Sequence, residues 1–440
     1  MWYSIRISIL CGLVASATAE ELTLEEALHL AEQQATELRT LEAEVALATA
    51  THKRTAQAFL PKVSTDAAWL RADGSLFDDV PAPALRMPLP ITYHDLGPVD
   101  TMVSGIQVVQ PLFHADAWKQ RKKAAHSVEA QRLSYDWGRR IMRVRVTSQY
   151  YAVAVRQTQE TAARKALKAA RQAWQMADAA YAEGLVARLD VARADAEVKG
   201  RQAMLAMAEA EVQREHVALQ TLLGLPLEES VTLVSKLPGS VPPPRAPVPA
   251  AERSDHLAWE ARNAAAQAGV EKAKAGWLPR ANLLARQQWV DIDEPIDRHV
   301  DGWLVALQLQ WTLFDGLGRE GAIAEARARR ERSRIQVEQS RREIAEQQQV
   351  AIDDWQSAWS AWRASKRAME AADEATTLAQ RQYEEGVGNM TDLLAAQAAL
   401  YQHRLENSRY QYQVLTASMH YYLRHGLDPL TPLLERDPQR

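Results

Sequence analysis

Two patterns of apolar and polar positions alternate along this chain, and each predicts a different kind of element. Long Ala-rich stretches with few internal Gly or Pro residues favour helices. Four shorter stretches alternate apolar and polar side chains with a period of two, which is typical of strands with one apolar and one polar face. The predicted strands cover residues 62–71, 101–112, 280–290 and 302–313.

The alternation is easiest to follow in the first and last of these strands. In the first, one face carries Val63, Thr65, Ala67 and Trp69, and the other carries Lys62, Ser64 and Asp66. In the last, the apolar series is Trp303, Val305, Leu307, Leu309, Trp311 and Leu313, and the residues between include Ala306, Gln308, Gln310 and Thr312. Each strand therefore offers one face to a lipid or core environment and one to water.

The predicted helices begin and end at recognisable signals. Thr23 can cap the first helix, which runs to about Gln57 and is stopped by Pro61. A much longer helix follows the second strand over residues 115–183, or about 100 Å at 1.5 Å per residue. The second part of the chain repeats this order, with helices predicted from about Asp255 to Gly276 and from the last strand to Glu385.

One short stretch occurs twice, each time between two long helices. Residues 181–191 and 383–393 both place Tyr three positions before Gly and Asp six positions after it. A glycine that ends one helix, followed by an Asp or Thr able to cap the next, predicts a tight helical hairpin. The return helices are expected to begin at Asp190 and Asp392.

These features divide the chain into two like halves. The first half covers residues 20–224 with its hairpin at 115–224, and the second covers 251–426 with its hairpin at 316–426. A proline-rich linker at 225–250 joins them, and a tail at 427–440 closes the chain. Pro61 and Pro279 are 218 positions apart, whereas Phe113 and Phe314 are 201 apart, so the first half has about 17 extra residues between its strands.

Residues 1–19 are predicted to be a secretory signal peptide. They contain a basic residue at Arg6, a short apolar run, and a small-x-small cleavage pattern that ends at Ala19. The only cysteine is Cys11, and Leu10 precedes it where a lipoprotein signal requires a small residue, so we do not expect lipidation. No later stretch has the ~18 apolar residues of a membrane helix.

Charge and composition do not indicate chemistry or nucleic-acid binding. The net charge is −4, and the arginine run 327–334 is interleaved with Glu, which is typical of a solvated helix face or a channel lining. The eleven His are scattered, and neither a Ser-His-Asp set nor a Gly-rich phosphate loop is present. We expect no enzyme activity, no cofactor and no metal site. Trp355, Trp359 and Trp362 are expected to form a buried helix seam.

The strands suggest a sheet in lipid. Each is about ten residues long, enough to cross a bilayer at a tilt, and a sheet in lipid must close on itself. Four strands cannot enclose a polar interior, because such barrels need about eight or more. Two chains would supply eight strands and three would supply twelve. A soluble sheet packed on a helical bundle is the alternative, against which tryptophans near the strand ends favour a membrane interface.

In this order of elements the chain resembles the TolC family of outer-membrane efflux channels. The resemblance rests on the two hairpin turns, the Phe59-Leu60-Pro61 and Trp277-Leu278-Pro279 motifs, the two Leu-Phe pairs after the strands, and the opening at residues 22–28. It implies a mainly α fold with a membrane β-barrel. The molecule would be a homotrimer with one 12-stranded barrel in the outer membrane and a helical tunnel in the periplasm.

The resemblance also implies partners and sites at the hairpin turns. Such channels meet a periplasmic adaptor and an inner-membrane pump, and the turn residues expected at the adaptor are Gly184, Leu185, Val186, Gly386 and Val387. The residues expected at the constriction are Asp392, Asp190, Tyr383 and Arg188. This chain departs from the family pattern at Gly388 and Ala395, where the family often has a basic and an acidic residue; Arg188 is the candidate for the missing charge.

Two functions of different classes follow. The first is an outer-membrane exit duct of an efflux or type I secretion system, powered by its partner pump, with drugs, metals and polypeptides all open as cargo. The second is a periplasmic coiled-coil scaffold or adaptor, which needs no strands with a continuous lipid face. For Asp190 and Asp392, simple helix capping is an alternative to a constriction role.

Overall fold

The computed structural model describes residues 20–73, 98–227, 231–234, 237–238, 253–294, 298–430 and 433. The expected signal peptide, most of the proline-rich linker and most of the tail lie outside the described residues. The chain forms two compact units, each described by itself. We call residues 1–43, 133–257 and 339–440 the hairpin unit, and residues 44–132 and 258–338 the strand unit.

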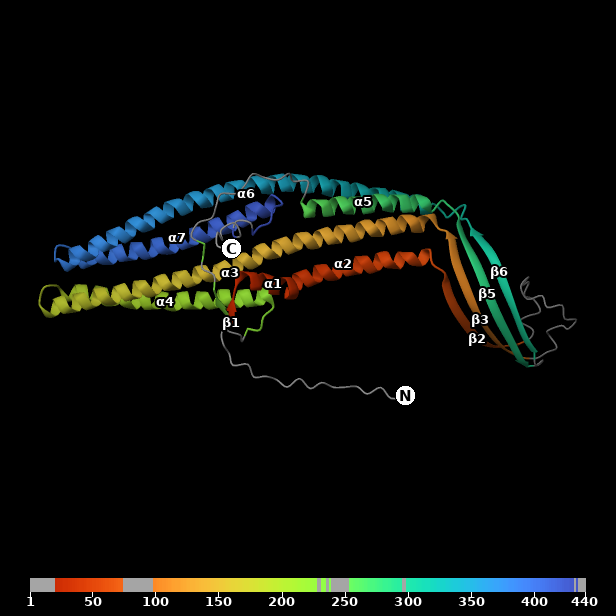
Figure 1. The fold of residues 1–440 in the computed structure, drawn as a ribbon, viewed down its shortest axis with the longest axis horizontal. Coiled ribbons are helices and arrows are strands. Elements are labelled where there is room, and N and C mark those ends of the chain that lie inside the picture. The colour runs from red at the N-terminus through yellow and green to blue at the C-terminus, as the bar shows by residue number, and fades with distance from the viewer. Residues whose placement is uncertain are drawn as a thin grey trace, which may run out of the picture. The chain divides into compact units, whose positions relative to one another are not determined.

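The order of helix, strand pair and long hairpin occurs twice, as the sequence predicts (Figure 1). The first occurrence contains α1 (Leu24–Gln34), α2 (Thr36–Arg54), the 3₁₀ helix η1 (Thr55–Ala58), β2 (Lys62–Asp73), β3 (Pro98–Phe113), α3 (Ala115–Ala182) and α4 (Arg188–Leu223). The second contains α5 (Ser254–Ala275), β5 (Arg280–Glu294), β6 (Arg298–Gln310), α6 (Gly318–Glu384) and α7 (Met390–Arg424). Within the described residues, no helix is long and apolar enough to span a membrane.

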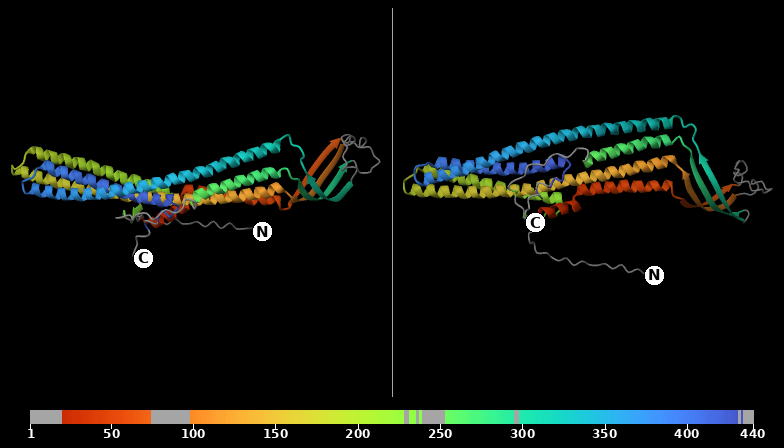
Figure 2. Two further views of the ribbon diagram at one scale, coloured as in Figure 1. Left: turned by 90° about the horizontal axis from the view of Figure 1, so that it is seen from above. Right: turned by 45° about the horizontal axis from the view of Figure 1, so that its top comes forward.

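The strand unit contains one four-stranded antiparallel sheet in the order β2-β3-β5-β6 (Figure 2). Lys62 pairs with Val109 in the first strand pair. Arg280, 218 positions after Lys62, pairs with Gln310, 201 positions after Val109. The same offsets, 218 and 201 residues, separate Pro61 from Pro279 and Phe113 from Phe314. Equivalent residues therefore pair with one another in β2-β3 and in β5-β6.

The sheet has the polar and apolar faces that the alternation predicts. Arg286 in β5 lies opposite Gln107 in β3, and its guanidinium donates hydrogen bonds to Gln107 and, at 2.8 Å, to Asp66 in β2. On the other face, Leu283 and Leu307 lie opposite one another. Polar contacts thus run across three strands on one face, and the apolar positions gather on the other.

Strand β6 ends earlier than the sequence pattern predicts. The expected strand 302–313 stops at Gln310, although Trp311 and Leu313 continue the alternation. Arg319 explains the difference, because its guanidinium donates to the main-chain carbonyls of Thr312 and Leu313 at 2.7 and 3.0 Å. The indole of Trp311 likewise donates to the Trp277 carbonyl at 3.1 Å. These bonds hold the strand-to-helix connection, so the helix begins only at Gly318.

The helix predicted to run from residue 23 to about residue 57 is interrupted. Ala35 is buried and has an extended backbone with ψ 121°, which ends α1, and α2 begins at the next residue. No Gly or Pro marks this break. A second feature absent from the sequence prediction is a small parallel sheet, in which β1 (Glu20–Leu22) pairs with β4 (Val231–Leu233) inside the expected linker. The Tyr150 hydroxyl donates to the Leu22 carbonyl at 2.9 Å and anchors this segment.

The hairpin unit is held by an apolar core and by a buried charged network. Trp362 is buried in the core and Trp359 packs against it, which confirms these members of the predicted seam. Arg253 is only 1% exposed, and its guanidinium binds both carboxylate oxygens of Asp255 at 3.0 and 2.7 Å. It also donates to the Arg424 carbonyl at 2.9 Å and lies 4.6 Å over the Trp137 ring. One side chain thus connects α3, α5 and α7.

Candidate functional site

The two hairpin turns have the same backbone structure. Gly184 and Gly386 have φ angles of 73° and 71°, the left-handed region that favours glycine. In each turn the next residue closes the helix end, with Leu185 N donating to Ala180 O at 2.9 Å and Val387 N donating to Gln382 O at 3.0 Å. This six-residue closure is the Schellman motif, so the repeated glycines end α3 and α6 as predicted.

Gly386→Ala is expected to loosen the second turn without displacing a neighbour. A Cβ at this position meets no atom within 4 Å, so the cost comes from the positive φ alone, about 1–2 kcal/mol. Amide hydrogen exchange over residues 380–392 should therefore accelerate about five- to thirtyfold. The matched control is Gly200→Ala, which also has open space but lies inside α4 and should slow exchange there. Unchanged exchange at 380–392 would contradict the strain argument.

The return helices begin earlier than predicted, and their caps are different residues. Helix α4 begins at Arg188 after Ala187, which makes no side-chain capping bond, and α7 begins at Met390 after Asn389. The Asn389 side chain accepts from the Asp392 main-chain amide at 2.8 Å and donates to the Asp392 carboxylate at 2.7 Å. The capping interpretation of Asp190 and Asp392 is therefore wrong, since both lie in the first turn of their helices, three residues after the N-cap.

The two hairpins pack together near their turns. Small buried residues on α3 and α4 contact Met390 and Leu393 at the start of α7, both of which are at most 2% exposed. The buried members of this cluster are Ala173, Ala177, Ala194, Met390 and Leu393. The apolar contacts fix the two turns relative to each other within the hairpin unit.

A polar contact next to this cluster also connects the hairpins. Arg193 on α4 donates to the Thr391 hydroxyl on α7 at 3.1 Å, and the same guanidinium nitrogen lies 3.8 Å from the Asp190 carboxylate. Tyr383 packs against the cluster, and its buried hydroxyl has no hydrogen-bond partner among the described residues. Burial, and then the negative charge of Asp190, raise the pKa of Tyr383. The structure thus brings Asp190 and Tyr383 together, with Arg193 as a member that the sequence reasoning missed.

Two of the residues predicted at the constriction, Arg188 and Asp392, do not take part in the contact between Arg193, Thr391 and Asp190. Arg188 is exposed and forms no ion pair within the part of the chain that the structure describes. Asp392 is exposed and is held by Asn389 in its own hairpin. A side chain at Gly388 would be tightly packed, because a Cβ there would lie 3.0 Å from the Gln382 Cβ. The spacing of three between Asp190 and Arg193 indicates that they share a helix face, but it does not indicate the contact of Arg193 with Thr391.

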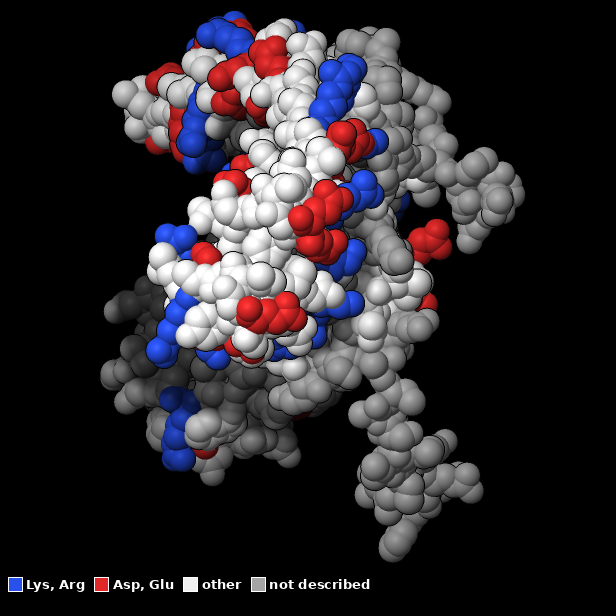
Figure 3. Space-filling model, turned by 90° about the vertical axis from the view of Figure 1, so that its left-hand side faces the viewer, with Lys and Arg blue, Asp and Glu red and all other residues white. Residues whose placement is uncertain are grey.

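The turns expose large apolar side chains. Leu185 is 72% exposed and Val387 is 77% exposed, whereas Val186 is half-buried. Figure 3 is seen from the side on which the hairpin turns lie in Figure 1. Acidic and basic side chains are interspersed there among uncharged ones, so no patch of one sign covers that view.

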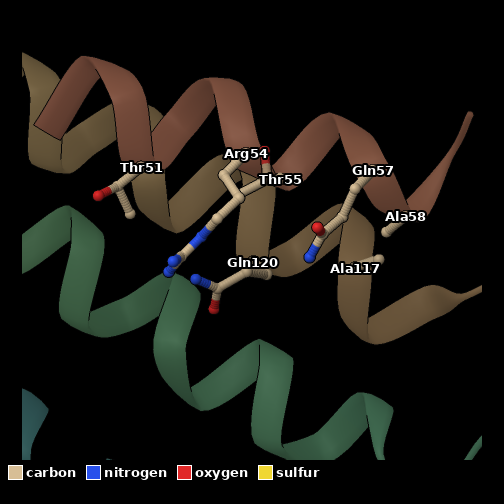
Figure 4. Close-up of a pocket in the computed structure, with 7 residues that line it drawn as sticks. All are labelled: Thr51, Arg54, Thr55, Gln57, Ala58, Ala117 and Gln120. Atoms are coloured by element: carbon tan, nitrogen blue, oxygen red, sulfur yellow. The ribbon is translucent and has the colours of Figure 1, made fainter.

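A small recess in the strand unit offers no catalytic groups (Figure 4). It has a volume of about 170 Å³ and lies between the end of α2, η1 and the start of α3. Its lining contains no carboxylate, histidine or cysteine and consists of Thr51, Arg54, Thr55, Gln57, Ala58, Ala117 and Gln120. Among the described residues, no three His, Cys, Asp or Glu side chains are grouped as metal ligands.

The fold matches solved outer-membrane channels. The Campylobacter jejuni CmeC channel aligns with a TM-score of 0.77 at 13% identity, covering 94% of this chain and 89% of that one. The open state of the Neisseria gonorrhoeae MtrE channel aligns at 0.76 and 17% identity, covering 92% and 89%. VceC from Vibrio cholerae aligns at 0.74 and 18% identity, covering 92% and 96%. These likenesses are to the fold.

The sequence itself matches one family over most of its length. No curated protein sequence matches it significantly. The family described as outer membrane efflux protein matches residues 27–225 and 250–422, which include both strand pairs and both hairpins. The chain therefore belongs to the outer membrane efflux protein family.

Proposed function

We propose that this outer-membrane efflux channel protein works as a homotrimer, and that it is the exit duct for a periplasmic adaptor and an inner-membrane pump. The proposal rests on the two outer strands of the sheet, β2 and β6, each of which has one edge unpaired in the part of the chain that the structure describes. Among the described strands, β2 pairs only with β3, and β6 pairs only with β5. An open edge is unstable in lipid, because its main-chain donors and acceptors have no water to bind.

Closure by copies of the same chain satisfies both edges at once. In a ring, β6 of one protomer pairs with β2 of the next, and every protomer uses the same two edges. Three copies give a barrel of twelve strands, which is wide enough for an aqueous interior lined by the polar face that carries Asp66, Gln107 and Arg286. The apolar face, with Leu283 and Leu307, then meets lipid.

Paired cysteines on the two edges test this closure. Thr65→Cys in β2 is combined in turn with Val305→Cys, Leu307→Cys or Leu309→Cys in β6, all on the apolar face. Cys11 lies in the expected signal peptide, so the mature chain brings no other thiol. On oxidation, at least one combination should give a covalent trimer on a non-reducing gel, because facing Cβ atoms in paired strands lie about 4.5–5.5 Å apart.

The single-cysteine variants are the controls and should remain monomeric on the gel. A ladder that stops at the dimer for every combination would contradict trimeric closure. A complete absence of linking across the three positions would contradict pairing between these two edges.

The hairpin turns are the proposed docking surface for the adaptor. Leu185 and Val387 are among the most exposed apolar side chains of the hairpin unit, and exposed apolar surface of this kind marks protein interaction sites. Gly184, Val186 and Gly386 complete this surface, since the two glycines fix the backbone that presents the apolar residues.

The constriction is proposed to lie beside the same turns. Asp190 and Asp392 would place carboxylates around the opening, with Tyr383 between the hairpins and Arg188 exposed at its edge. In this proposal the chain performs no chemistry, and opening is a hinge motion of the hairpins driven by its partners.

The scaffold or adaptor alternative is not favoured. A scaffold or adaptor does not require four strands with a continuous apolar face. The family match also covers the strand pairs as well as the helices.

A further inference from the structure

A second and larger groove lies in the strand unit, close to the helix ends that join the sheet. Its volume is about 580 Å³, and it is formed by the start of α3, the length of α5 and the start of α6. The floor is made of small residues, because α5 and α6 present Ala265, Ala266, Gly269, Ala273, Ala322 and Ala326 to it. A groove of this size with an apolar floor fits a small organic molecule.

The rim of this groove is strongly basic. Five cationic residues line it, namely Lys123, Arg262, Lys272, Arg319 and Arg329, against the two carboxylates of Asp116 and Glu325. Both carboxylates are engaged, since Asp116 binds Arg280 at 2.6 Å and Glu325 binds Arg329. Arg319 is paired with Asp315. With five cations against two carboxylates, the lining of the groove keeps a net positive charge.

Lys123 is the central cation. Its side chain lies across Gly269, where a Cβ would meet the Lys123 Cδ and Nζ at 3.9 and 4.0 Å. Within the described ranges, neither Lys123 nor Lys272 has an ion-pair partner. Burial lowers the pKa of Lys123 first, and the positive charges of Lys272 and Arg329 lower it further. Lys123 is half-buried, whereas Lys272 and Arg329 are exposed, so a bound anion would offset the cost of keeping the Lys123 ammonium charged.

One ion pair links the lining of the groove to the polar face of the sheet. Arg280 is the first residue of β5, and it shares a face with Asn282 and Arg286 by the alternation of the strand. The same Arg280 binds Asp116 in the groove lining. The polar face that would line the barrel is therefore continuous with the basic groove, whereas the lipid-facing side chains point the other way.

We propose that this groove binds amphiphilic organic anions passing through the channel, with the anionic group held by Lys123 and Lys272 and the apolar body lying on the small residues of α5. This inference rests on the proposed channel function, because it requires the polar face of the sheet to line the path. The inference narrows the proposed cargo to amphiphilic organic anions, which the groove would recognise by their charge and shape.

The test uses the purified full chain in detergent, with naphthalene-1-sulfonate as the probe and 1-naphthylmethylammonium as its cationic counterpart. Isothermal titration should show saturable binding of the sulfonate and at least tenfold weaker binding of the ammonium ion. Lys123→Gln combined with Lys272→Gln should weaken sulfonate binding at least about tenfold, or ~1.4 kcal/mol. Gly269→Leu, which fills the floor and keeps every charge, should weaken it similarly. Lys165→Gln, an exposed lysine elsewhere on α3, is the matched control and should change nothing.

Planar-bilayer currents separate this inference from the channel function. Wild-type channels should be blocked by the sulfonate at concentrations near its binding constant, and the lysine double variant should conduct without that block. Equal binding of both probe ions, or binding indifferent to the lysine and glycine variants, would overturn the groove as a site while leaving a conducting trimer intact. Binding without any effect on current would overturn its role in transport. The absence of any current would instead contradict the channel function itself.

Discussion

Arg253→Met is expected to lower the free energy of unfolding of the hairpin unit by about 3 kcal/mol. Removing one member of a buried ion pair costs about 3–5 kcal/mol, because the other charge is left without compensation. The lower figure applies because the Asp255 side chain is 24% exposed and partly screened by water. The variant also leaves the Arg424 carbonyl without the donor that binds it at 2.9 Å.

Two further variants separate lost pairing from lost bulk. Arg253→Lys keeps the charge but cannot bind both Asp255 oxygens in parallel, so it should fall between wild type and Arg253→Met. Arg363→Met, at an exposed position on α6, should leave stability unchanged within about 0.5 kcal/mol. Urea unfolding followed by tryptophan fluorescence measures all three. Equal midpoints for Arg253→Met and Arg363→Met would show that the buried network does not hold the unit together.

Arg193→Ala is expected to raise the ratio of open to closed time of the channel several-fold. Arg193 is the polar connection between the hairpins next to the turns, through the Thr391 hydroxyl at 3.1 Å and the Asp190 carboxylate at 3.8 Å. Losing a contact worth about 1 kcal/mol shifts an opening equilibrium about fivefold. Single-channel recording in a planar bilayer gives both the conductance and the fraction of time spent open.

Arg188→Ala is the matched comparison, because it removes the same charge five residues earlier on the same helix. Arg188 is exposed and unpaired within the described residues, so its loss should change the ratio of open to closed time by less than about twofold. The opposite ranking, with Arg188→Ala opening the channel and Arg193→Ala silent, would assign the bridge to contacts between protomers. Arg193 would then not be the residue that holds the turns together.

The sequence predicted the fold where its signals were local and strong. Period-two alternation found all four strands of the sheet, and the repeated glycines found both turns, because a positive φ admits few other residues. The break at Ala35 could not be predicted, since no breaker marks it and the buried packing around α1 determines it. Strand β6 was drawn three residues too long because the bonds of Arg319 to the Thr312 and Leu313 carbonyls are tertiary contacts.

The candidate site was predicted less completely than the fold. The family resemblance pointed to Asp190 and Tyr383, which the structure brings together, whereas the contact of Arg193 with Thr391 was not predicted. That contact depends on which helix face meets the second hairpin, and single-helix spacing does not contain that information. At Gly388 a Cβ would be in tight contact with Gln382, which is a local feature that favours glycine there.

The mass of the detergent-extracted protein tests the central claim most directly. Light scattering with the detergent contribution subtracted, on protein taken from the outer-membrane fraction, should give three chains per particle. Three chains would supply twelve strands and pair both open edges of every sheet. A monomer released without detergent would mean that the strands are not in lipid, and it would contradict the shared barrel on which the proposed function depends.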